Sequence, residues 1–210
     1  MPGIKRLLKF MVERHRIYIR RFIEKESPPW TSDPILQHYR FTNIMRELDT
    51  VTIWIREHIR EPYAKHPNLW FMLCLARQIN WPPTLQELMD KKAWPIDIWN
   101  PRKARDVMKK RKARGEKLYT GAYLLNAWGK DPSDPSDKAY FTCYYTMGKL
   151  WKEREKVILP VLKKKSLQLT AEALIPYHGW GPFTAAQAVA DLKYTRYLKN
   201  ADDWWDWAFL

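Results

Sequence analysis

The sequence predicts an all-α protein. Apolar residues recur at helical spacing in two long segments near the start of the chain, residues 4–26 and 34–59. No stretch alternates apolar and polar residues over several strands, and no internal repeat is visible. A chain of 210 residues is long enough to bury a real core. We therefore expect a single helical domain over residues 1–210, with lobes at residues 1–130 and 138–210.

The first predicted helix runs from Ile4 to Glu26. Its apolar residues fall near helical spacing, and basic residues crowd the positions between them. The arginines of this basic run are Arg14, Arg16, Arg20 and Arg21. A run of this kind is usually a solvated face. Clustered guanidinium groups also hold phosphate in a bidentate manner, so phosphate binding is the other interpretation.

A second helix is predicted after a proline-containing break at residues 27–32. Asp33 is a good N-cap, and Pro34 suits the first helical position. The apolar positions predict one long helix from Pro34 to about Ile59. Polar residues interrupt the apolar pattern and, one turn apart, can cluster on one surface or simply pair with one another. They are Arg40, Asn43, Arg46, Glu47 and Asp49.

The rest of the chain reads as shorter helices. Helical pieces over residues 63–89 are broken at Pro67 and at residues 81–83. Residues 140–162 and 167–174 predict two more helices, and residues 131–137, rich in Pro, Ser and Asp, predict a flexible loop. The most basic segment, residues 102–117, is either a solvated helix or a face that follows phosphates, and its central residues are Lys109, Lys110, Arg111 and Lys112.

The composition favours a polyanionic partner. The chain has 37 Lys and Arg against 23 Asp and Glu, a net charge of +14 and a pI of about 9.7. A surplus of this size favours nucleic acid over the alternative of a generic basic protein. The sequence also holds 12 Trp and 11 Tyr. Most of these rings should belong to the core, but some could stack on an unpaired base.

Cysteine use and hydropathy limit the cellular compartments in which we expect the protein. Cys74 and Cys143 show neither metal-ligand spacing nor a disulfide framework, so we expect no metal site and a reducing cytoplasm. The longest apolar stretch, Leu69 to Ala76, is too short to span a bilayer. The basic N-terminus lacks the apolar run and cleavage site of a signal peptide.

A pair of glycines organises the last part of the chain. Within residues 174–192, an apolar lead reaches Gly179 and Gly181, and small residues then open a helix. Such a turn leaves backbone amides bare beside the positive end of the helix, where they can hold phosphate. The pattern resembles the helix-hairpin-helix of the DNA-glycosylase superfamily, with Tyr177 and His178 where that family has proline before the first glycine. A helix C-cap followed by a new helix is the other interpretation.

A longer resemblance covers most of the chain. The strings R-x-x-I-Y-I-R-R at residues 14–21 and P-W-T-S-D-P-I-L-Q-H-Y-R-F-T-N-I-M-R-E-L-D at residues 29–49 resemble the α-glutamyl/putrescinyl thymine pyrophosphorylases, also described as amino acid:DNA transferases. This group includes the helical domain fused to some 5-hydroxymethyluridine DNA kinases. The resemblance resumes at residues 119–123 and runs through the hairpin to Asp203. It implies a helix-hairpin-helix DNA-glycosylase-like fold, with two helical lobes around a cleft.

The resemblance also implies a reaction. The substrate would be 5-(pyrophosphoryloxymethyl)uracil in double-stranded DNA, flipped out of the base stack. An amino acid or polyamine would replace pyrophosphate on the C5 methylene, with no metal or cofactor required. A 5-hydroxymethyluridine DNA kinase is a candidate partner, and a bacteriophage protein in the host cytoplasm is expected. The chain ends at Leu210, before the glycine-rich segment of such proteins, so it is either naturally short or cut.

The resemblance assigns roles to particular residues. Glycosylase-like folds place a working aspartate beyond the hairpin, where Asp202 and Asp203 stand, with a helix N-cap as the alternative role. Phe183 occupies the place of the hairpin lysine of bifunctional glycosylases, which argues against an imine-forming lyase. The expected catalytic residues are Asp202, Asp203, Asp49 and Asn43. The expected pyrophosphate-binding residues are Arg14, Arg16, Arg20, Arg21, Trp30, Asp33, Tyr39, Arg40 and Arg46. The expected DNA-binding residues are His178, Gly179, Trp180, Gly181, Thr184, Lys109, Lys110, Arg111 and Lys112.

Two other functions remain open. A DNA glycosylase acting on a modified base would use the same aspartate to stabilise positive charge on the sugar, and would leave an abasic product. A non-catalytic DNA-binding module that recruits a separate kinase would bind DNA and leave its base composition unchanged. Walker, H-E-x-x-H and G-x-S-x-G strings are absent, which argues against an autonomous kinase, zinc protease or esterase.

Overall fold

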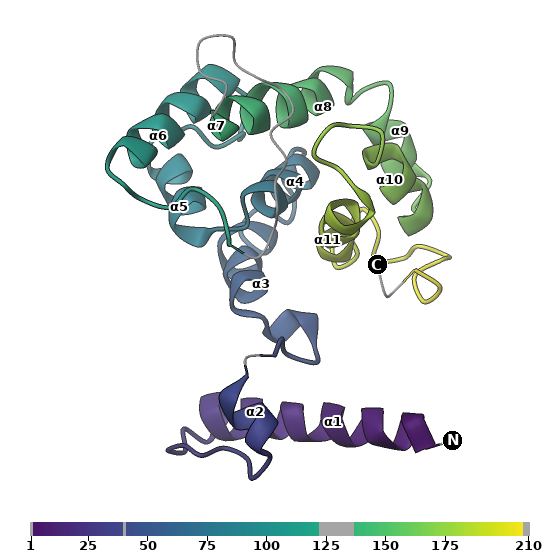
Figure 1. Ribbon diagram of the computed structural model, residues 1–210. Coiled ribbons are helices and arrows are strands. Elements are labelled where there is room, and N and C mark those ends of the chain that lie inside the picture. The colour runs from purple at the N-terminus through teal and green to yellow at the C-terminus, as the bar shows by residue number, and fades with distance from the viewer. Residues whose placement is uncertain (1, 40, 122–136, 208–210) are drawn as a thin grey trace. The chain divides into compact units, whose positions relative to one another are not determined.

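Helix α4 (Leu69–Ile79) lies at the centre of the larger part of the structure (Figure 1). The computed structural model describes residues 2–39, 41–121 and 137–207, and every regular element in these ranges is helical. All 11 residues of α4 are buried. A helix that is apolar nearly all round is stable only when other elements cover it on every side. The all-α class predicted from the sequence is confirmed for the described residues.

The chain divides into two units, residues 1–53 and 54–210, and each is described by itself. The first unit contains α1 (Pro2–Tyr18), the π-helical turn η1 (Ile19–Ile23), α2 (Pro34–His38), the 3-10 turn η2 (Arg46–Leu48) and most of α3 (Thr50–Ile55). The second unit contains the π-helical turn η3 (Arg56–Arg60), α4, α5 (Pro82–Asp90), α6 (Pro101–Ala113), α7 (Lys138–Tyr140), the π-helical turn η4 (Phe141–Thr146), α8 (Met147–Glu153), α9 (Ile158–Lys163), α10 (Leu167–Leu174) and α11 (Pro182–Leu192). The lobe boundary predicted near residues 131–137 stays a prediction, because residues 122–136 lie outside the described part.

The first unit begins as the sequence predicts. Helix α1 continues directly into η1, so the predicted helix from Ile4 extends to Ile23. After the break, the Asp33 carboxylate caps α2 by accepting hydrogen bonds from the backbone N–H groups of Ile35 at 2.8 Å and Leu36 at 3.1 Å. A capping carboxylate satisfies amides that have no partner within the helix.

The single long helix predicted from Pro34 to about Ile59 is wrong. Helix α2 ends at His38, and Tyr39 follows in an extended conformation with φ −102° and ψ 141°. Asn43 then donates a hydrogen bond from Nδ2 to the carbonyl of Leu48 at 2.7 Å. Asp49 restarts the helix by accepting the backbone N–H groups at the start of α3. Short polar side chains compete with the helical ladder for backbone groups, which is why the apolar pattern alone misled the prediction.

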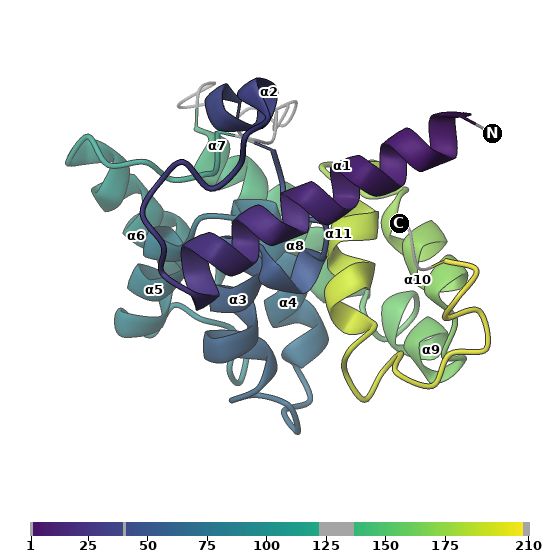
Figure 2. The ribbon, with the colours of Figure 1, turned by 90° about the horizontal axis from the view of Figure 1, so that it is seen from below.

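The second unit is held together by a buried ion pair between α4 and α11. The Arg77 guanidinium donates to both oxygens of Asp191, at 2.5 and 2.8 Å, and both side chains are almost fully buried. Helix α10 lies beside α11 in both views, and α9 packs against α10 (Figures 1 and 2). A bidentate pair fixes the rotation of both helices as well as their separation.

Aromatic rings fill much of the core of this unit, as the high Trp and Tyr content predicts. The Phe71 ring lies 5.5 Å from that of Trp99 and 4.9 Å from that of Trp151, in edge-to-face geometry. The indole nitrogen of Trp99 donates to the carbonyl of Cys143 at 3.1 Å. Both cysteines are free and buried, and burial raises the pKa of Cys74 and of Cys143, so both thiols stay protonated.

Candidate functional site

A cavity of about 520 Å³ lies within the first unit. Its lining comes from α1 and η1, from the break at residues 28–31, and from α2 and the chain after it. We call it the cationic pocket, and its charged or aromatic lining residues are Arg14, Arg21, Phe22, Trp30, His38, Tyr39 and Phe41. The volume falls in the range of small-molecule sites.

Arg14 is anchored at the wall of the pocket. Its Nη2 donates to the carbonyl of Phe41 at 2.7 Å and to Oδ1 of Asn43 at 3.1 Å, and its Nε donates to the same carbonyl at 3.3 Å. Burial, and then the positive charge of Arg21, lower the pKa of Arg14. Two guanidinium groups close enough to repel each other create a site that a bound anion would stabilise.

Arg21 is held by rings rather than by carboxylates. Its guanidinium carbon lies 4.9 Å from the ring centres of both Phe22 and Trp30. The described residues offer it no acidic partner within ion-pair distance. The indole nitrogen of Trp30 donates to the carbonyl of Glu26 at 2.7 Å, which fixes the ring. A cation stacked on fixed rings keeps its donors directed at a ligand.

The other predicted pyrophosphate-binding residues separate into different groups. Tyr39 lines the pocket, whereas Asp33 is the cap of α2 and is not part of the lining. Arg20 donates to the carbonyl of Trp30 at 2.6 Å, and Arg16 pairs with Glu13 at 3.7 Å, so both have partners within the unit. Arg46 lies in η2, half-buried. Arg40 lies outside the described residues.

Phe22, His38 and Phe41 line the pocket although they were not among the predicted binding residues. The prediction of one long helix placed His38 and Phe41 in the middle of a helical face. The extended conformation of Tyr39 instead brings the following chain back towards α1, where the Phe41 ring packs on Phe10 with centres 5.5 Å apart. The signals in the sequence were the pair Thr42-Asn43 and the pair Asp49-Thr50, residue types that are typical of caps and turns.

Two predicted catalytic residues of the first unit have clear structural partners. Asn43 accepts from Arg14 at 3.1 Å and donates to Leu48, so it links α1 to η2. Asp49 accepts the backbone N–H groups of Val51 at 3.1 Å and Thr52 at 3.2 Å and caps α3. Their catalytic roles stay predictions.

Asp203 caps a helix that is distant from it in the sequence. It accepts hydrogen bonds from Ser166 Oγ at 2.7 Å, the Leu167 N–H at 2.9 Å and the Gln168 N–H at 3.0 Å, at the start of α10. Burial raises the pKa of Asp203, but these hydrogen bonds together outweigh burial and lower it. Asp202 is exposed beside it. Asp203 thus bonds the start of α10, whose own N-cap is Ser166, and does not act as the expected N-cap before Trp204 and Trp205. A catalytic role for either aspartate stays a prediction.

The loop between α10 and α11 needs only one of its two glycines. Gly179 has φ +81°, and a Cβ there would lie 2.8 Å from Oγ1 of Thr146. Gly181 has φ −77° and ψ 172°, which any residue adopts, and a Cβ there would meet open space. Of the two, only Gly179 therefore requires the conformational freedom of glycine. Gln78 donates to the Gly179 carbonyl at 2.9 Å, so α4 holds the loop.

The residues of this loop that were predicted to contact DNA differ in their exposure to solvent. His178 is exposed and Thr184 is half-buried near the start of α11, so both remain candidates. Trp180 is only 1% exposed. Its ring is therefore a core residue and cannot stack on a base unless the loop rearranges, which corrects its assignment as a DNA contact.

The two glycines predict different mutational effects. Gly179→Ala should lower the free energy of unfolding by about 1–3 kcal/mol, because a side chain is strained in this conformation and meets Thr146. Gly181→Ala is the matched control and should change it by less than about 0.5 kcal/mol. Urea denaturation followed by circular dichroism measures both. Equal stability of the two variants would show that the loop does not depend on Gly179.

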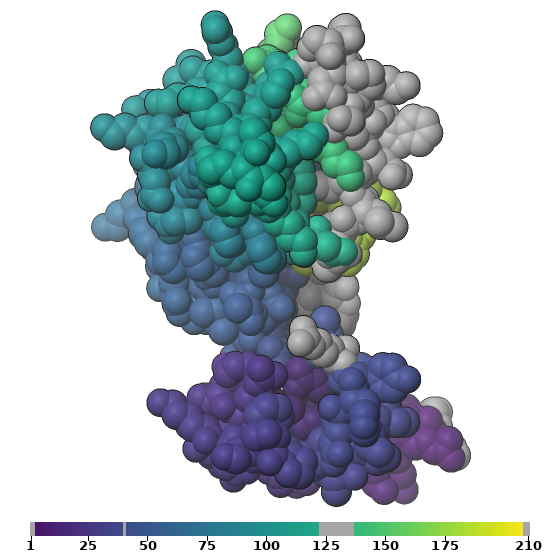
Figure 3. All heavy atoms as spheres, turned by 60° about the vertical axis from the view of Figure 1, so that its left-hand side comes forward, coloured from purple at the N-terminus to yellow at the C-terminus, as the bar shows by residue number. Residues whose placement is uncertain are grey.

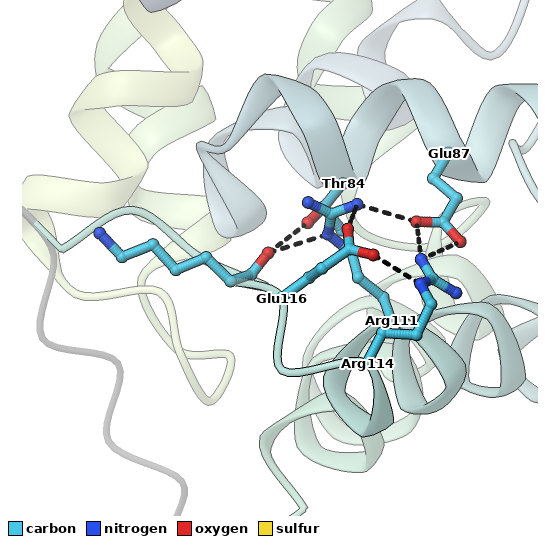
Figure 4. Close-up of polar contacts among 6 residues, drawn as sticks. Thr84, Glu87, Arg111, Arg114 and Glu116 are labelled. Carbon is cyan, nitrogen blue, oxygen red and sulfur yellow. Dashed lines mark hydrogen bonds and ion pairs between the residues drawn. The ribbon is translucent and has the colours of Figure 1, made fainter.

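The basic segment forms α6, but Arg111 is not part of its solvated face. Arg111 is 9% exposed and donates from Nη1 to Glu87 at 2.9 Å and from Nε to the carbonyl of Lys117 at 2.9 Å. Glu116 pairs with the same Nη1 at 2.6 Å, and Arg114 completes the network (Figure 4). Hydrogen bonds from both arginines outweigh burial and lower the pKa of Glu87. The assignment of Arg111 as a phosphate contact is therefore wrong, because its donors connect α6 to α5.

The neighbouring lysines Lys109, Lys110 and Lys112 are exposed on α6. The teal segment that contains α6 lies at the front of the face drawn in Figure 3. We expect the three lysines to contact DNA phosphate. Replacing all three by Gln should flatten the dependence of log affinity on log salt by about 0.9 unit per lost phosphate contact. Fluorescence anisotropy with a DNA duplex at several salt concentrations measures the slope.

A control with the same change in charge is available at the exposed residues 163–165, which are all lysine. The corresponding triple Gln variant should keep the parent slope. If both variants flatten the slope equally, net charge rather than the α6 face determines binding.

The described residues contain no group of three or more His, Cys, Asp or Glu side chains that could hold a metal ion. No helix in the described ranges combines the length and apolar character that crossing a membrane requires.

Comparison with known proteins identifies the family. The family described as "5-hmdU DNA kinase, helical domain" matches residues 2–208 of the chain. A 5-hmdU DNA kinase of Bacillus phage SP10 is 27% identical over an alignment that covers 92% of this chain and 32% of the phage protein. The chain thus spans about a third of the length of this relative. No solved structure matches. The sequence resemblance is confirmed to this level, and the chain belongs to the family of helical domains of 5-hmdU DNA kinases.

Proposed function

We propose that the protein modifies thymine-derived bases in bacteriophage DNA. It displaces pyrophosphate from 5-(pyrophosphoryloxymethyl)uracil and attaches an amino acid or polyamine to the C5 methylene, within the infected host cell. Family membership supports the setting of phage DNA modification. The observation that carries the reaction is the cationic pocket, where two guanidinium groups stand among aromatic rings and no acidic side chain belongs to the described lining.

The pocket matches the chemistry of this substrate. A pyrimidine ring can stack on fixed aromatic side chains, as unpaired bases do on Trp, Tyr and Phe. The pyrophosphate carries several negative charges, and Arg14 and Arg21 supply two positive charges at the pocket wall. Guanidinium groups placed where charge develops on a leaving group lower the barrier to its departure. In this proposal the base must leave the DNA stack to enter the pocket, as in other enzymes that react with a base.

Mass spectrometry of nucleosides tests the proposal. DNA carrying 5-(pyrophosphoryloxymethyl)uracil is incubated with the protein and with single amino acids, putrescine or no amine. The proposal expects an amine-dependent gain of the mass of the amine on the base, together with release of one equivalent of pyrophosphate. Intact pyrophosphorylated base in every reaction would contradict it, and abasic sites would show a glycosylase.

A second function is favoured by the phage relative, which is named as a kinase and is about three times as long as the matched region. In this alternative the protein holds the modified base for a kinase and performs no chemistry. It would bind DNA that contains 5-hydroxymethyluracil and leave its nucleosides unchanged. The same mass spectra, with and without the kinase, separate the two functions.

A further inference from the structure

His38 ends α2 and lines the cationic pocket. Its Nδ1 lies 2.7 Å from the carbonyl oxygen of Pro34. A carbonyl oxygen only accepts hydrogen bonds, so Nδ1 must carry a proton. In the neutral ring the lone pair is then on Nε2, and the described residues make no hydrogen bond to that nitrogen. The backbone of α2 therefore fixes the tautomer that can accept a proton at Nε2.

The other titratable groups of the pocket lack this ability. They are Arg14 and Arg21, reaching it from α1 and η1, and Tyr39 from the chain after α2. Guanidinium groups stay charged, and phenols stay protonated near neutral pH. No carboxylate is among the described lining residues. The imidazole is the type of side chain that exchanges a proton near neutrality, and His38 is the histidine of this lining.

The aspartates that were predicted to act as the general base differ from His38 in their surroundings. Asp49 and Asp203 each accept the backbone N–H groups of a helix start. Burial raises the pKa of Asp203, but the hydrogen bonds at the start of α10 outweigh burial and lower it, so this carboxylate accepts a proton less readily. Asp202 is exposed and is not among the lining residues of the pocket.

We propose that His38 is the proton acceptor for the incoming amine. The inference rests on the proposed function and deepens it. The ammonium group of the donor transfers one proton to Nε2 of His38, and the nitrogen lone pair then forms the new bond to the C5 methylene. The carbon–oxygen bond breaks, and its electron pair leaves with pyrophosphate between the two arginines. Nε2 afterwards releases its proton to solvent, which returns His38 to its initial state.

The His38→Asn variant tests this role with little change in structure. The amide Nδ2 of Asn can donate to the Pro34 carbonyl as Nδ1 of His38 does, but an amide cannot accept a proton near neutral pH. Turnover of the pyrophosphorylated base with an amino acid donor should fall by about 10²–10⁴-fold at neutral pH. Single-turnover rates are measured from pH 6.5 to 9 by the mass assay, a range in which the amount of free amine rises by about tenfold per pH unit. The rate of the variant should rise with that gain, while the parent rate levels off.

Each outcome decides the inference. A parent rate in His38→Asn overturns it, and so does a loss that is equal at every pH, which would show a positioning role. Retained turnover in His38→Asn beside lost turnover in Asp202→Asn with Asp203→Asn would assign the base to the carboxylates. A parent protein that never consumes the modified base contradicts the proposed function itself, and is recognised before any variant is measured.

Discussion

The Arg21→Met variant should turn over the pyrophosphorylated base about 10²–10³ times more slowly than the parent, the usual loss when one preorganised group that stabilises a developing anion is removed. Met keeps much of the apolar contact with Phe22 and Trp30, while the positive charge disappears. The fold should persist, because no described carboxylate is left without its partner. Single-turnover kinetics measured by pyrophosphate release give the rate, and the melting temperature checks the fold.

Arg6→Met is the matched control for this charge change. Arg6 is exposed on α1 and does not belong to the lining of the cationic pocket. It should leave the rate of turnover within about threefold of the parent, since an exposed charge far from a reacting group contributes little. Equal rates in Arg21→Met and the parent would remove the cationic pocket from the reaction.

Arg77→Ala should destabilise the second unit by about 3–5 kcal/mol, because it leaves the Asp191 carboxylate buried without its counter-ion. Asp191 is 0% exposed and Arg77 1% exposed, so water cannot replace the lost partner without local opening. Guanidinium denaturation followed by tryptophan fluorescence measures the free energy of unfolding. A loss below about 1 kcal/mol, typical of surface pairs, would contradict the buried geometry.

A double variant separates the charge from the packing. Arg77→Met with Asp191→Leu removes both charges and keeps similar volumes, and such replacements of buried pairs are often neutral or stabilising. It should recover most of the loss, less the cost of the Asn80 side chain, which accepts from Arg77 at 3.1 Å. Failure to recover would show that the pair specifies the packing of α4 on α11.

Much of the fold could be predicted from the sequence, because helices are specified by residues close to one another in the chain. The first helix was predictable from periodicity, and α2 from Asp33 and Pro34, since both signals lie within a few residues of the structure they specify. At residues 42–50, by contrast, periodicity predicted a continuous helix where the chain is mostly irregular. There the polar side chains of Asn43 and Asp49 bind nearby backbone groups, and this competition is invisible to a count of apolar positions.

The candidate site depends on contacts between residues that are far apart in the sequence. Arg14 and Arg21 were predicted from their clustering to bind phosphate, and both line the pocket, but His38 and Phe41 join them only because the chain turns at Tyr39. In the sequence Arg111 cannot be distinguished from the lysines next to it, whereas in the structure it donates to Glu87 of α5. Nothing in a charge run distinguishes an arginine that faces water from one that faces a carboxylate 24 positions away.

The sequence by itself determined the helical class, the positive charge, the family resemblance and the start of α2, because composition and local capping are properties of short segments. Only the tertiary structure decided which groups meet. Asp203 caps α10 across 36 positions, and Arg77 pairs with Asp191 across 114. A hydrogen bond or ion pair forms wherever two groups are brought within about 3 Å, whatever their separation along the chain. The packing of the helices therefore selected which of the predicted polar residues stabilise the fold and which remain available to a substrate.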